Sequence, residues 1–331
     1  MRSARLDSSL SARLLSRCPM WYARGADDAL DRPAHVRAGS SLAWINGVLV
    51  LVQDDANFIA LVDPATGQAG AITLPAGEGG QRQFDDARGN KAHKLDLEAC
   101  CVVDGTSGPT LLAFGSGSSE RRYRVVMVEA WQNASPRARI VDASALYQRL
   151  VATSAFTGSE MNIEGALALP GTLRLVGRGN GAPRPGLEPK NATCDLSLAA
   201  LLRYLDDPGA HAPPMPANVV EYSLDEIDGL ALGFTDMTTM GDAILYTATA
   251  EASPSATEDG RVSGSVIGVM STSGALRYAT ITDSEGRSLT LKVEGIAVAR
   301  HSTDRVFVVV DSDDPTLPSD LCEVELSGDW T

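Results

Sequence analysis

An acidic residue at the head of a short apolar run recurs at nearly constant intervals along this chain. The stretch "MNIEGALAL" has Glu164 there, "LDLEACCVV" has Glu98, "DEIDGLALGF" has Asp228 and "LKVEGIAVA" has Glu294. Successive acids are 66, 64 and 66 residues apart, and Ser40 in "AGSSLAWINGVLVLV" lies 58 residues before Glu98. A period of this length is typical of repeat architectures, so the spacing predicts five repeats that span nearly the whole chain.

Each repeat continues with a turn and a second apolar strand. These second strands are expected at 47–55, 110–118, 172–180, 243–251 and 305–314. Units of this size with several antiparallel strands, repeated around a ring, predict an all-β fold: a five-bladed β-propeller with one axial metal site. The chain is then a single domain, 1–331, with repeats near 36–90, 91–155, 156–220, 221–285 and 286–331 and with 1–35 as a segment that closes the ring. One helix is expected at 194–207, with Asp195 as its N-cap.

Charge and composition limit the kinds of molecule that the protein is expected to bind and the compartment in which it is expected. The formal net charge of −14 and the pI of about 4.7 disfavour nucleic acid as a partner, because such a surface repels phosphate backbones. The five cysteines lack any framework spacing, which favours reduced thiols. The N-terminus has no apolar leader and no run is long enough to span a membrane, so a cytoplasmic protein that binds no membrane is expected.

The repeated acids predict a metal site. The first strand of each propeller blade lines the central channel, so Ser40, Glu98, Glu164, Asp228 and Glu294 are expected to converge on the axis; Ser41 is an equal candidate for the first position. Carboxylates held this close repel one another unless a cation neutralises them. An all-oxygen set selects a hard cation, with Ca²⁺ preferred and Mg²⁺ as the alternative. The competing interpretation is that each acid only accepts backbone N–H groups at a turn.

The same residues carry a resemblance to a known family. The order Ser40, Glu98, Glu164, Asp228, Glu294 resembles the axial set of the calcium-activated nucleotidases, or apyrases, in which five blades contribute Ser, Glu, Glu, Ser and Glu. "SSLAWINGVLVLVQDD" and "KVEGIAV" are similar to the first-blade and last-blade motifs of that family. The strand starts resemble phytase-like propeller hydrolases more loosely. The resemblance implies a five-bladed propeller with an axial calcium ion and a phosphoanhydride or phosphoester as substrate.

Catalytic candidates follow from the direction of the strands. The second strand of each repeat returns to the face that carries the axial acids, so the residues at its end should surround the same opening. Arginine holds anions through paired N–H groups, and carboxylates or a histidine can transfer protons. The candidates are Asp54, His93, Arg121, Arg178, Glu251 and Asp311, with Arg122 as a further anion-binding candidate. The Gly/Pro-rich insertion "GRGNGAPRPGLEPKNAT" is expected to act as a lid or recognition loop.

The sequence therefore favours a calcium-dependent propeller hydrolase that acts on a small anionic molecule. Two alternatives stay open. One is a lactonase, glycosidase or lyase, for which paired carboxylates would suffice without arginine. The other is a non-catalytic binding module in which the ion only braces the ring, since propellers host all of these functions.

Overall fold

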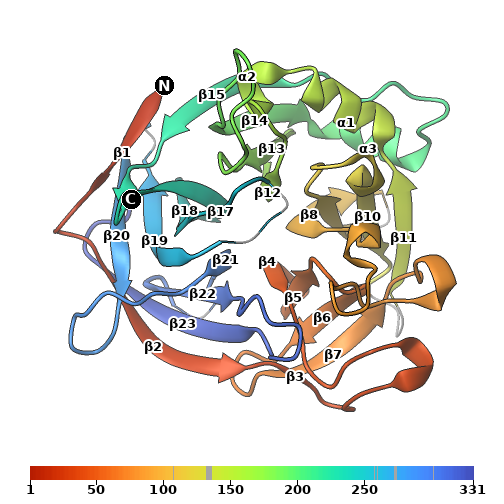
Figure 1. The fold of residues 1–331 in the computed structure, drawn as a ribbon, viewed down its shortest axis with the longest axis horizontal. Helices are drawn as coiled ribbons and strands as arrows, with labels where there is room; N and C mark the ends of the chain where they lie inside the picture. The colour runs from red at the N-terminus through yellow and green to blue at the C-terminus, as the bar shows by residue number, and fades with distance from the viewer. Residues whose placement is uncertain (107, 132–135, 257, 259, 272–273, 301) are drawn as a thin grey trace.

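The computed structural model describes residues 1–331 except 107, 132–135, 257, 259, 272–273 and 301. Its strands form consecutive antiparallel meanders around a central axis, which gives a β-propeller fold (Figure 1). Each meander runs from an inner strand beside the axis to an outer strand at the rim. The expectation of an all-β, propeller-like chain is confirmed at this level.

The first three meanders follow one another along the chain. The first comprises β4 (Gly39–Ile45), β5 (Val48–Gln53), β6 (Phe58–Val62) and β7 (Gln68–Thr73), with the short β3 (Trp21–Tyr22) parallel to β7. The second comprises β8 (Leu97–Gly105), β9 (Gly108–Gly115), β10 (Arg124–Glu129) and β11 (Arg137–Asp142). The third comprises β12 (Ile163–Leu169), β13 (Thr172–Gly177), β14 (Asn191–Ser197) and β15 (Ala217–Ser223).

The last two meanders are completed by the N-terminal segment. The fourth comprises β17 (Leu230–Met240), preceded by the short β16 (Glu226–Ile227), then β18 (Ala243–Glu251), β19 (Val262–Met270) and β20 (Leu276–Thr282). The fifth comprises β21 (Val293–Val298), β22 (Arg305–Val310), β23 (Asp320–Ser327) and, antiparallel to β23, the N-terminal β2 (Ser11–Pro19). Strand β1 (Arg2–Leu6) lies parallel to both β15 and β20. The two ends of the chain therefore share one sheet.

The inner strands form a closed ring. In turn, β4 contacts β8, β8 contacts β12, β12 contacts β17, β17 contacts β21, and β21 returns to β4. Apolar side chains fill the spaces between neighbouring meanders; Val50 and Val52 of β5, for example, cluster with Leu111 of β9 and Val126 of β10. Each sheet buries both of its faces in this way, which explains the nearly continuous Val, Leu and Ile of the middle strands.

Asp236 ties three of the inner strands together. It lies within β17 and is only 1% exposed, and one of its carboxylate oxygens accepts hydrogen bonds from Ser41 Oγ of β4 and from the backbone N–H of Ile296 of β21. Burial raises the pKa of Asp236 well above its usual range, while these hydrogen bonds lower it.

The three α-helices of the described residues lie toward the rim (Figure 1). Helices α1 (Ser144–Val151) and α2 (Ser154–Thr157) connect β11 to β12, and α3 (Leu198–Asp206) follows β14 (Figure 1). Short 3₁₀ turns complete the described elements: η1 (Asp28–Leu30), η2 (Glu78–Gly80), η3 (Lys91–His93) and η4 (Glu120–Arg122). In the described part of the chain, no helix combines the length and hydropathy of a membrane span.

The helix expected at 194–207 is present but begins later. Ser197, not Asp195, is the N-cap of α3, and its hydroxyl accepts from the N–H of Ala200. Asp195 belongs to β14 and pairs with Arg174 of β13. Strand β14 continues to Ser197 and α3 follows it directly, so the N-cap lies two residues later than the sequence predicted.

Candidate functional site at the axis

A β-bulge turns one residue out of register at the start of four of the five inner strands. The pairing shifts at Ser40 in β4, Glu98 in β8, Glu164 in β12 and Glu294 in β21. The extra residue of a bulge is unpaired, so its side chain is re-aimed. These four residues line a common cavity at the axis. The bulge explains why an acidic residue can occupy the start of an apolar strand: its side chain points into the cavity instead of the core.

The fourth inner strand departs from the expected set. Its bulge falls at Thr235, between Phe234 and Asp236, so Thr235 occupies the position predicted for Asp228. Thr235 is fully buried and donates to Thr247 Oγ1 rather than lining the cavity.

Asp228 itself is exposed, on the hairpin between β16 and β17. Asp228 and Gly229 both have positive φ, 50° and 75°, and form the two-residue loop of that hairpin. Asp-Gly is a preferred sequence for such loops. The prediction of Asp228 as an axial ligand is therefore corrected: the pattern was a turn signal.

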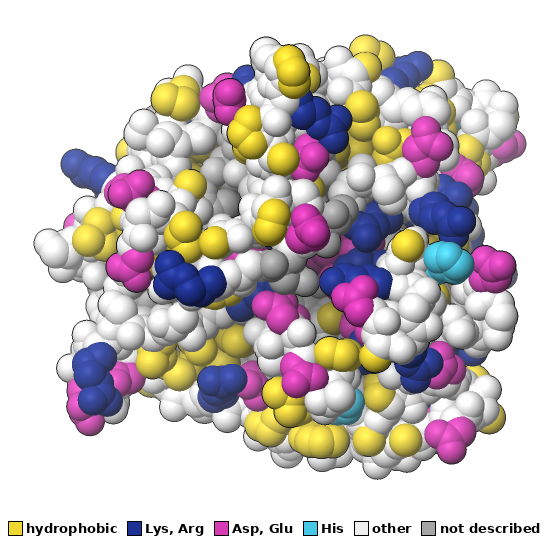
Figure 2. Space-filling model, viewed as in Figure 1, with side chains coloured by type: hydrophobic (Ala, Val, Ile, Leu, Met, Phe, Trp, Pro, Cys, Tyr) yellow, Lys and Arg dark blue, Asp and Glu magenta, His cyan; other side chains and the backbone are white. Residues whose placement is uncertain are grey.

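The cavity encloses about 200 Å³ and is strongly acidic. Among the described residues, thirteen Asp or Glu and five Lys or Arg line it. Figure 2 shows acidic and basic side chains gathered around the hollow near the middle of this face. The excess of carboxylates favours a cationic ligand, because charges at a cavity wall determine the field inside it.

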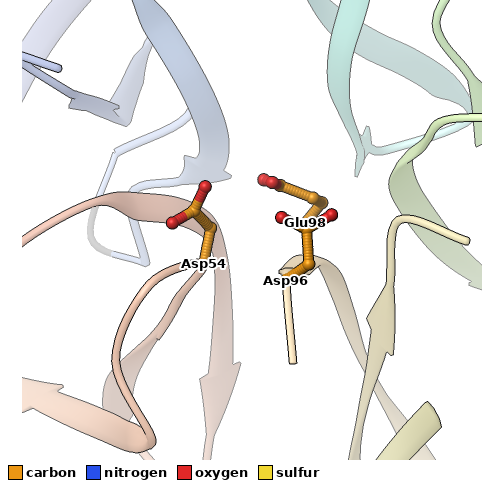
Figure 3. Close-up of side chains that lie close together, drawn as sticks. All are labelled: Asp54, Asp96 and Glu98. Atoms are coloured by element: carbon orange, nitrogen blue, oxygen red, sulfur yellow. The ribbon is translucent and has the colours of Figure 1, made fainter. Parts of the chain in front are cut away.

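Three carboxylates meet between the first two meanders. Oxygen atoms of Asp54, Asp96 and Glu98 all lie within 4.8 Å of one another, with Asp54 facing the other two across a gap (Figure 3). Lys94 Nζ lies 2.6 Å from both Asp54 Oδ2 and Asp96 Oδ1. Arg122 Nη1 lies 2.8 Å from the other oxygen of Asp96. Asp54 and Asp96 are thus paired with cations.

Glu98 differs from its neighbours. Its carboxylate has no hydrogen bond or ion pair with any residue in the described part of the chain. Burial, together with the charges of Asp54, Asp96 and Glu164, raises the pKa of Glu98 well above its usual range, and Lys94 only partly offsets this. A carboxylate in this position is stabilised by a bound cation or by a proton.

The opposite wall of the cavity is a second network of charges. Arg178 is 6% exposed, and its guanidinium lies 2.6 Å from Glu251 Oε2, 3.4 Å from Glu164 Oε1 and 4.0 Å from Glu294 Oε2. Lys292 Nζ lies 3.5 Å from Glu294 and 2.5 Å from Asp313. Burial raises the pKa of Glu164 to about 7 and that of Glu294 to about 8, although Arg178 and Lys292 act in the opposite direction.

Asp311 lies on the same side, at the end of β22. One of its oxygens accepts from Ser319 Oγ and the other from the backbone N–H of Asp313. Burial raises the pKa of Asp311 to about 6; Lys292 lowers it, while Asp313 and Asp54 raise it. The pKa of this carboxyl is therefore raised but stays below neutral pH.

The structure brings together most, but not all, of the candidates from the sequence. Asp54, Arg178, Glu251 and Asp311 line the cavity with the bulge residues. Ser40 faces it, whereas Ser41 turns away to Asp236.

Two catalytic candidates are corrected. Arg121 is exposed on η4, and its neighbour Arg122 enters the cavity instead. His93 is exposed on η3, 3.6 Å from Glu78, and the following Lys94 points inward. In both cases the tight turn sends adjacent side chains in opposite directions.

Sequence reasoning missed three residues at the site. Asp96, two residues before Glu98, and Lys292, two residues before Glu294, precede the bulge and point into the same cavity. In extended chain, residues two apart lie on the same face, so the position two residues before each axial acid is the signal that could have found them. Asn162 similarly precedes Glu164 and donates to it at 2.6 Å.

The fold and this cavity define a propeller protein with an acidic axial site. The chain belongs to the family described as "Family of unknown function (DUF6929)", whose model matches residues 35–326. No curated protein sequence matches the chain significantly.

Solved structures similar over most of the chain have different activities. They include a glutaminyl cyclase of Myxococcus xanthus, with 12% identity, a TM-score of 0.46 and coverage of 97% of this chain and 98% of that chain. A PQQ-bound aldose sugar dehydrogenase of Streptomyces coelicolor has 10% identity, a TM-score of 0.40 and coverage of 97% and 100%. An arabinanase of Bacillus subtilis has 10% identity, a TM-score of 0.40 and coverage of 88% and 94%. Similarity at this level assigns no activity to the chain.

Proposed function

We propose that the five meanders are the five blades of a propeller whose axial cavity binds a divalent cation, Ca²⁺ first, and hydrolyses a small anionic substrate. A phosphoester or phosphoanhydride is the first substrate class. The enzyme part of the proposal rests on the cation, because an anion enters an acidic cavity only when a cation offsets the negative charge.

The observation that carries the proposal is Glu98. It is the carboxylate of the cavity without a partner among the described residues, and two further carboxylates lie within 4.8 Å of it. An uncompensated charge inside a protein is costly. The unpaired carboxylate of Glu98, which lies beside two others, is therefore poorly stabilised unless a cation binds there.

The donor set fits a hard cation. Asp54, Asp96 and Glu98 would hold the ion, and Ser40, Glu164 and Glu294 are the next oxygen groups around the cavity. No His lines the cavity among the described residues, which disfavours zinc. Ca²⁺ accepts six to eight oxygen ligands in irregular arrangements, whereas Mg²⁺ requires a near-octahedral set, so this uneven wall favours Ca²⁺.

The chain's own residues have separate roles in this proposal. Arg178 and Lys292 orient the anionic group from the wall opposite Glu98, while Glu164, Glu251 and Glu294 hold these two cations in place. Asp311 accepts the proton of the attacking water, since a base with a pKa of about 6 is mostly ionised at neutral pH. When bound, a divalent cation would polarise an oxygen of the substrate and make a coordinated water more acidic.

Hydrolysis assays test this function. Purified protein is incubated with a panel of phosphoesters, phosphoanhydrides and lactones in Ca²⁺, in Mg²⁺ and in EDTA. The proposal expects phosphate release that EDTA abolishes, that Ca²⁺ restores and that Glu98→Gln lacks. Calcium binding without turnover of any phosphorylated compound would contradict the hydrolase, and lactone turnover alone would transfer the assignment to the lactonase alternative.

One observation favours a second candidate, a non-catalytic module with a structural ion. Each described Lys or Arg that lines the cavity already forms an ion pair with a carboxylate. An anionic substrate must compete with those carboxylates. If chelation lowers the Tm but no substrate is turned over, the binding module is the better account.

A further inference from the structure

A second cavity of about 350 Å³ lies beside the axial one, among loops of the second, third and fourth meanders. Its wall is formed where the insertions of the fold meet. Val151 of α1, Ser154 and Thr157 of α2, and Leu187 of the Gly/Pro-rich insertion all contribute. The insertion expected to recognise a ligand is therefore part of a defined cavity.

The two cavities share a wall. Ala256 lines both of them. The segment before β12 also faces both, since Met161 lines the second cavity and Asn162 the axial one. A molecule bound at the axis could extend past this segment into the second cavity.

Glu160 holds the loops that form the second cavity. Its carboxylate accepts the backbone N–H groups of Ala182 at 3.3 Å and of Ala256 at 3.0 Å, and it pairs with Arg184 at 3.0 Å. Its pKa is lowered because these hydrogen bonds outweigh its partial burial. Glu160 and Arg184 are the charged residues of the described lining and they pair with each other, so this cavity carries no net charge.

Ser159 is the residue that points to a ligand. It is 5% exposed, and its hydroxyl has no hydrogen-bond partner in the described part of the chain. Buried hydroxyls are normally satisfied, so an orphaned one in a cavity wall is a recognised sign of a missing ligand or water. The neighbouring lining is rich in hydroxyl groups, from Ser118, Ser154, Thr157 and Ser255.

Apolar surface completes the wall. Val151 and Leu187 are 44% and 36% exposed, which is unusual for large apolar residues of this chain. Met161 and the ring of Tyr123 lie deeper, and Tyr123 is held in place by stacking on Tyr147 with ring centroids 5.0 Å apart. Hydroxyl groups that donate and accept, beside flat apolar surface, match the two faces of a sugar ring.

We propose that the second cavity binds the uncharged, polyhydroxylated part of the substrate, so that the substrate is a sugar or polyol phosphate with its phosphoryl group at the axis. The substrate class rests on the proposed hydrolase function; the sugar site itself does not.

Two variants test the site without touching the axial residues. Ser159→Ala removes the orphaned hydroxyl, so it is expected to raise the Tm and to weaken sugar binding. Leu187→Trp places a large side chain at the exposed mouth and is expected to block entry. The matched control is Ser263→Ala, because the Ser263 hydroxyl is also buried without a partner but lies outside the cavity.

The first measurement uses no turnover. Saturation-transfer NMR with glucose as probe is expected to give a signal for the wild type and for Ser263→Ala. The signal of Ser159→Ala and of Leu187→Trp is expected to be at least fivefold weaker than that of the wild type. Absence of a signal in the wild type, or an unchanged signal in Leu187→Trp, would overturn the sugar site.

The second measurement compares glucose 6-phosphate with methyl phosphate, which lacks the sugar. We expect both Ser159→Ala and Leu187→Trp to raise KM for glucose 6-phosphate at least fivefold and to change KM for methyl phosphate less than twofold. Equal effects on the two substrates would contradict the inference and leave the hydrolase standing. If the wild type turned over neither substrate, the hydrolase function would be contradicted. The NMR signal of glucose would then be the sole test of the sugar site.

Discussion

Lys94 Nζ lies 2.6 Å from Asp96 Oδ1 and occupies the space between the carboxylates that would hold a divalent ion. The ammonium group is buried, with 8% of the side chain exposed, so it neutralises the acids in place of an ion. A cation that binds Asp54, Asp96 and Glu98 must therefore compete with Lys94 for the same oxygen atoms.

Lys94→Met is expected to raise the affinity for Ca²⁺ at least tenfold, because the competing charge is gone. In EDTA the same variant should be destabilised by about 3–5 kcal/mol, the usual cost of leaving buried partners of a broken ion pair uncompensated. Isothermal titration calorimetry measures the affinity, and thermal unfolding with and without Ca²⁺ measures the stability. Lys190→Met, which removes a partly exposed pair with Glu221, is the control. Weaker Ca²⁺ binding by Lys94→Met would exclude the competition.

The ion-free protein should lose stability as the pH rises. Burial raises the pKa of Asp311 to about 6, of Glu164 to about 7 and of Glu294 to about 8. The folded state then holds protons that the unfolded chain releases, so the free energy of unfolding decreases with rising pH, by linkage, between the ordinary carboxyl pKa of about 4 and pH 8.

The Tm measured in EDTA is accordingly expected to fall by several degrees between pH 5 and pH 8. Saturating Ca²⁺ should reduce this fall, because a bound cation stabilises the ionised carboxylates. A Tm in EDTA that rises across this range would show that the acids are ionised and well paired in the ion-free protein.

Asp311→Asn tests whether Asp311 is the general base. Removal of a general base commonly costs 10²–10⁴-fold in rate, and we expect a loss of that order in kcat/KM for the phosphorylated substrate. The acidic limb of the wild-type pH profile should have an apparent pKa of about 6 and should disappear in the variant. Lys292, Asp313 and Asp54 are the charged groups around Asp311 that adjust this value. Asp283→Asn, on an exposed turn, serves as the control, and retention of the limb in Asp311→Asn would assign the base elsewhere.

The N-terminal strand should be essential for the ring. Ala12 of β2 is 1% exposed and packs in the core cluster of the last two meanders. Ala12→Asp buries an unpaired carboxylate there and is expected to lower stability by more than about 3 kcal/mol. Ser16→Asp on the exposed side of the same strand should change stability by less than about 0.5 kcal/mol. Urea unfolding measures both, and equal effects would mean that β2 does not close the sheet.

Much of the fold could be predicted from the repeat period, because each meander contributes an apolar inner strand at the same interval. The acids at Glu98, Glu164 and Glu294 were found for the same reason. The fourth position was not, since Asp228-Gly229 satisfies the pattern locally and yet forms a hairpin loop. The bulge at Thr235 depends on pairing with β18, a long-range feature that no local motif encodes.

The rest of the site depends on turns. The sequence does not decide which of two adjacent residues enters the cavity, Arg121 or Arg122 in one turn and His93 or Lys94 in the other. The geometry of η4 and η3 decides it. The sequence predicts the insertion beside the second cavity only as a lid or recognition loop, and it does not predict the cavity itself. Its wall joins residues from four separate segments, within 117–123, 151–161, 184–187 and 255–256, which a period along the chain cannot reveal.

The most direct test of the account is calcium binding by the wild type and by Glu98→Gln, measured by isothermal titration calorimetry after chelation and buffer exchange. Glutamine has the shape of glutamate without its charge, so it removes the unpaired carboxylate and leaves the packing intact. We predict one Ca²⁺ per chain for the wild type and an affinity at least tenfold weaker for the variant. No binding by the wild type, or equal affinities for the two proteins, would contradict a cation site centred on Glu98.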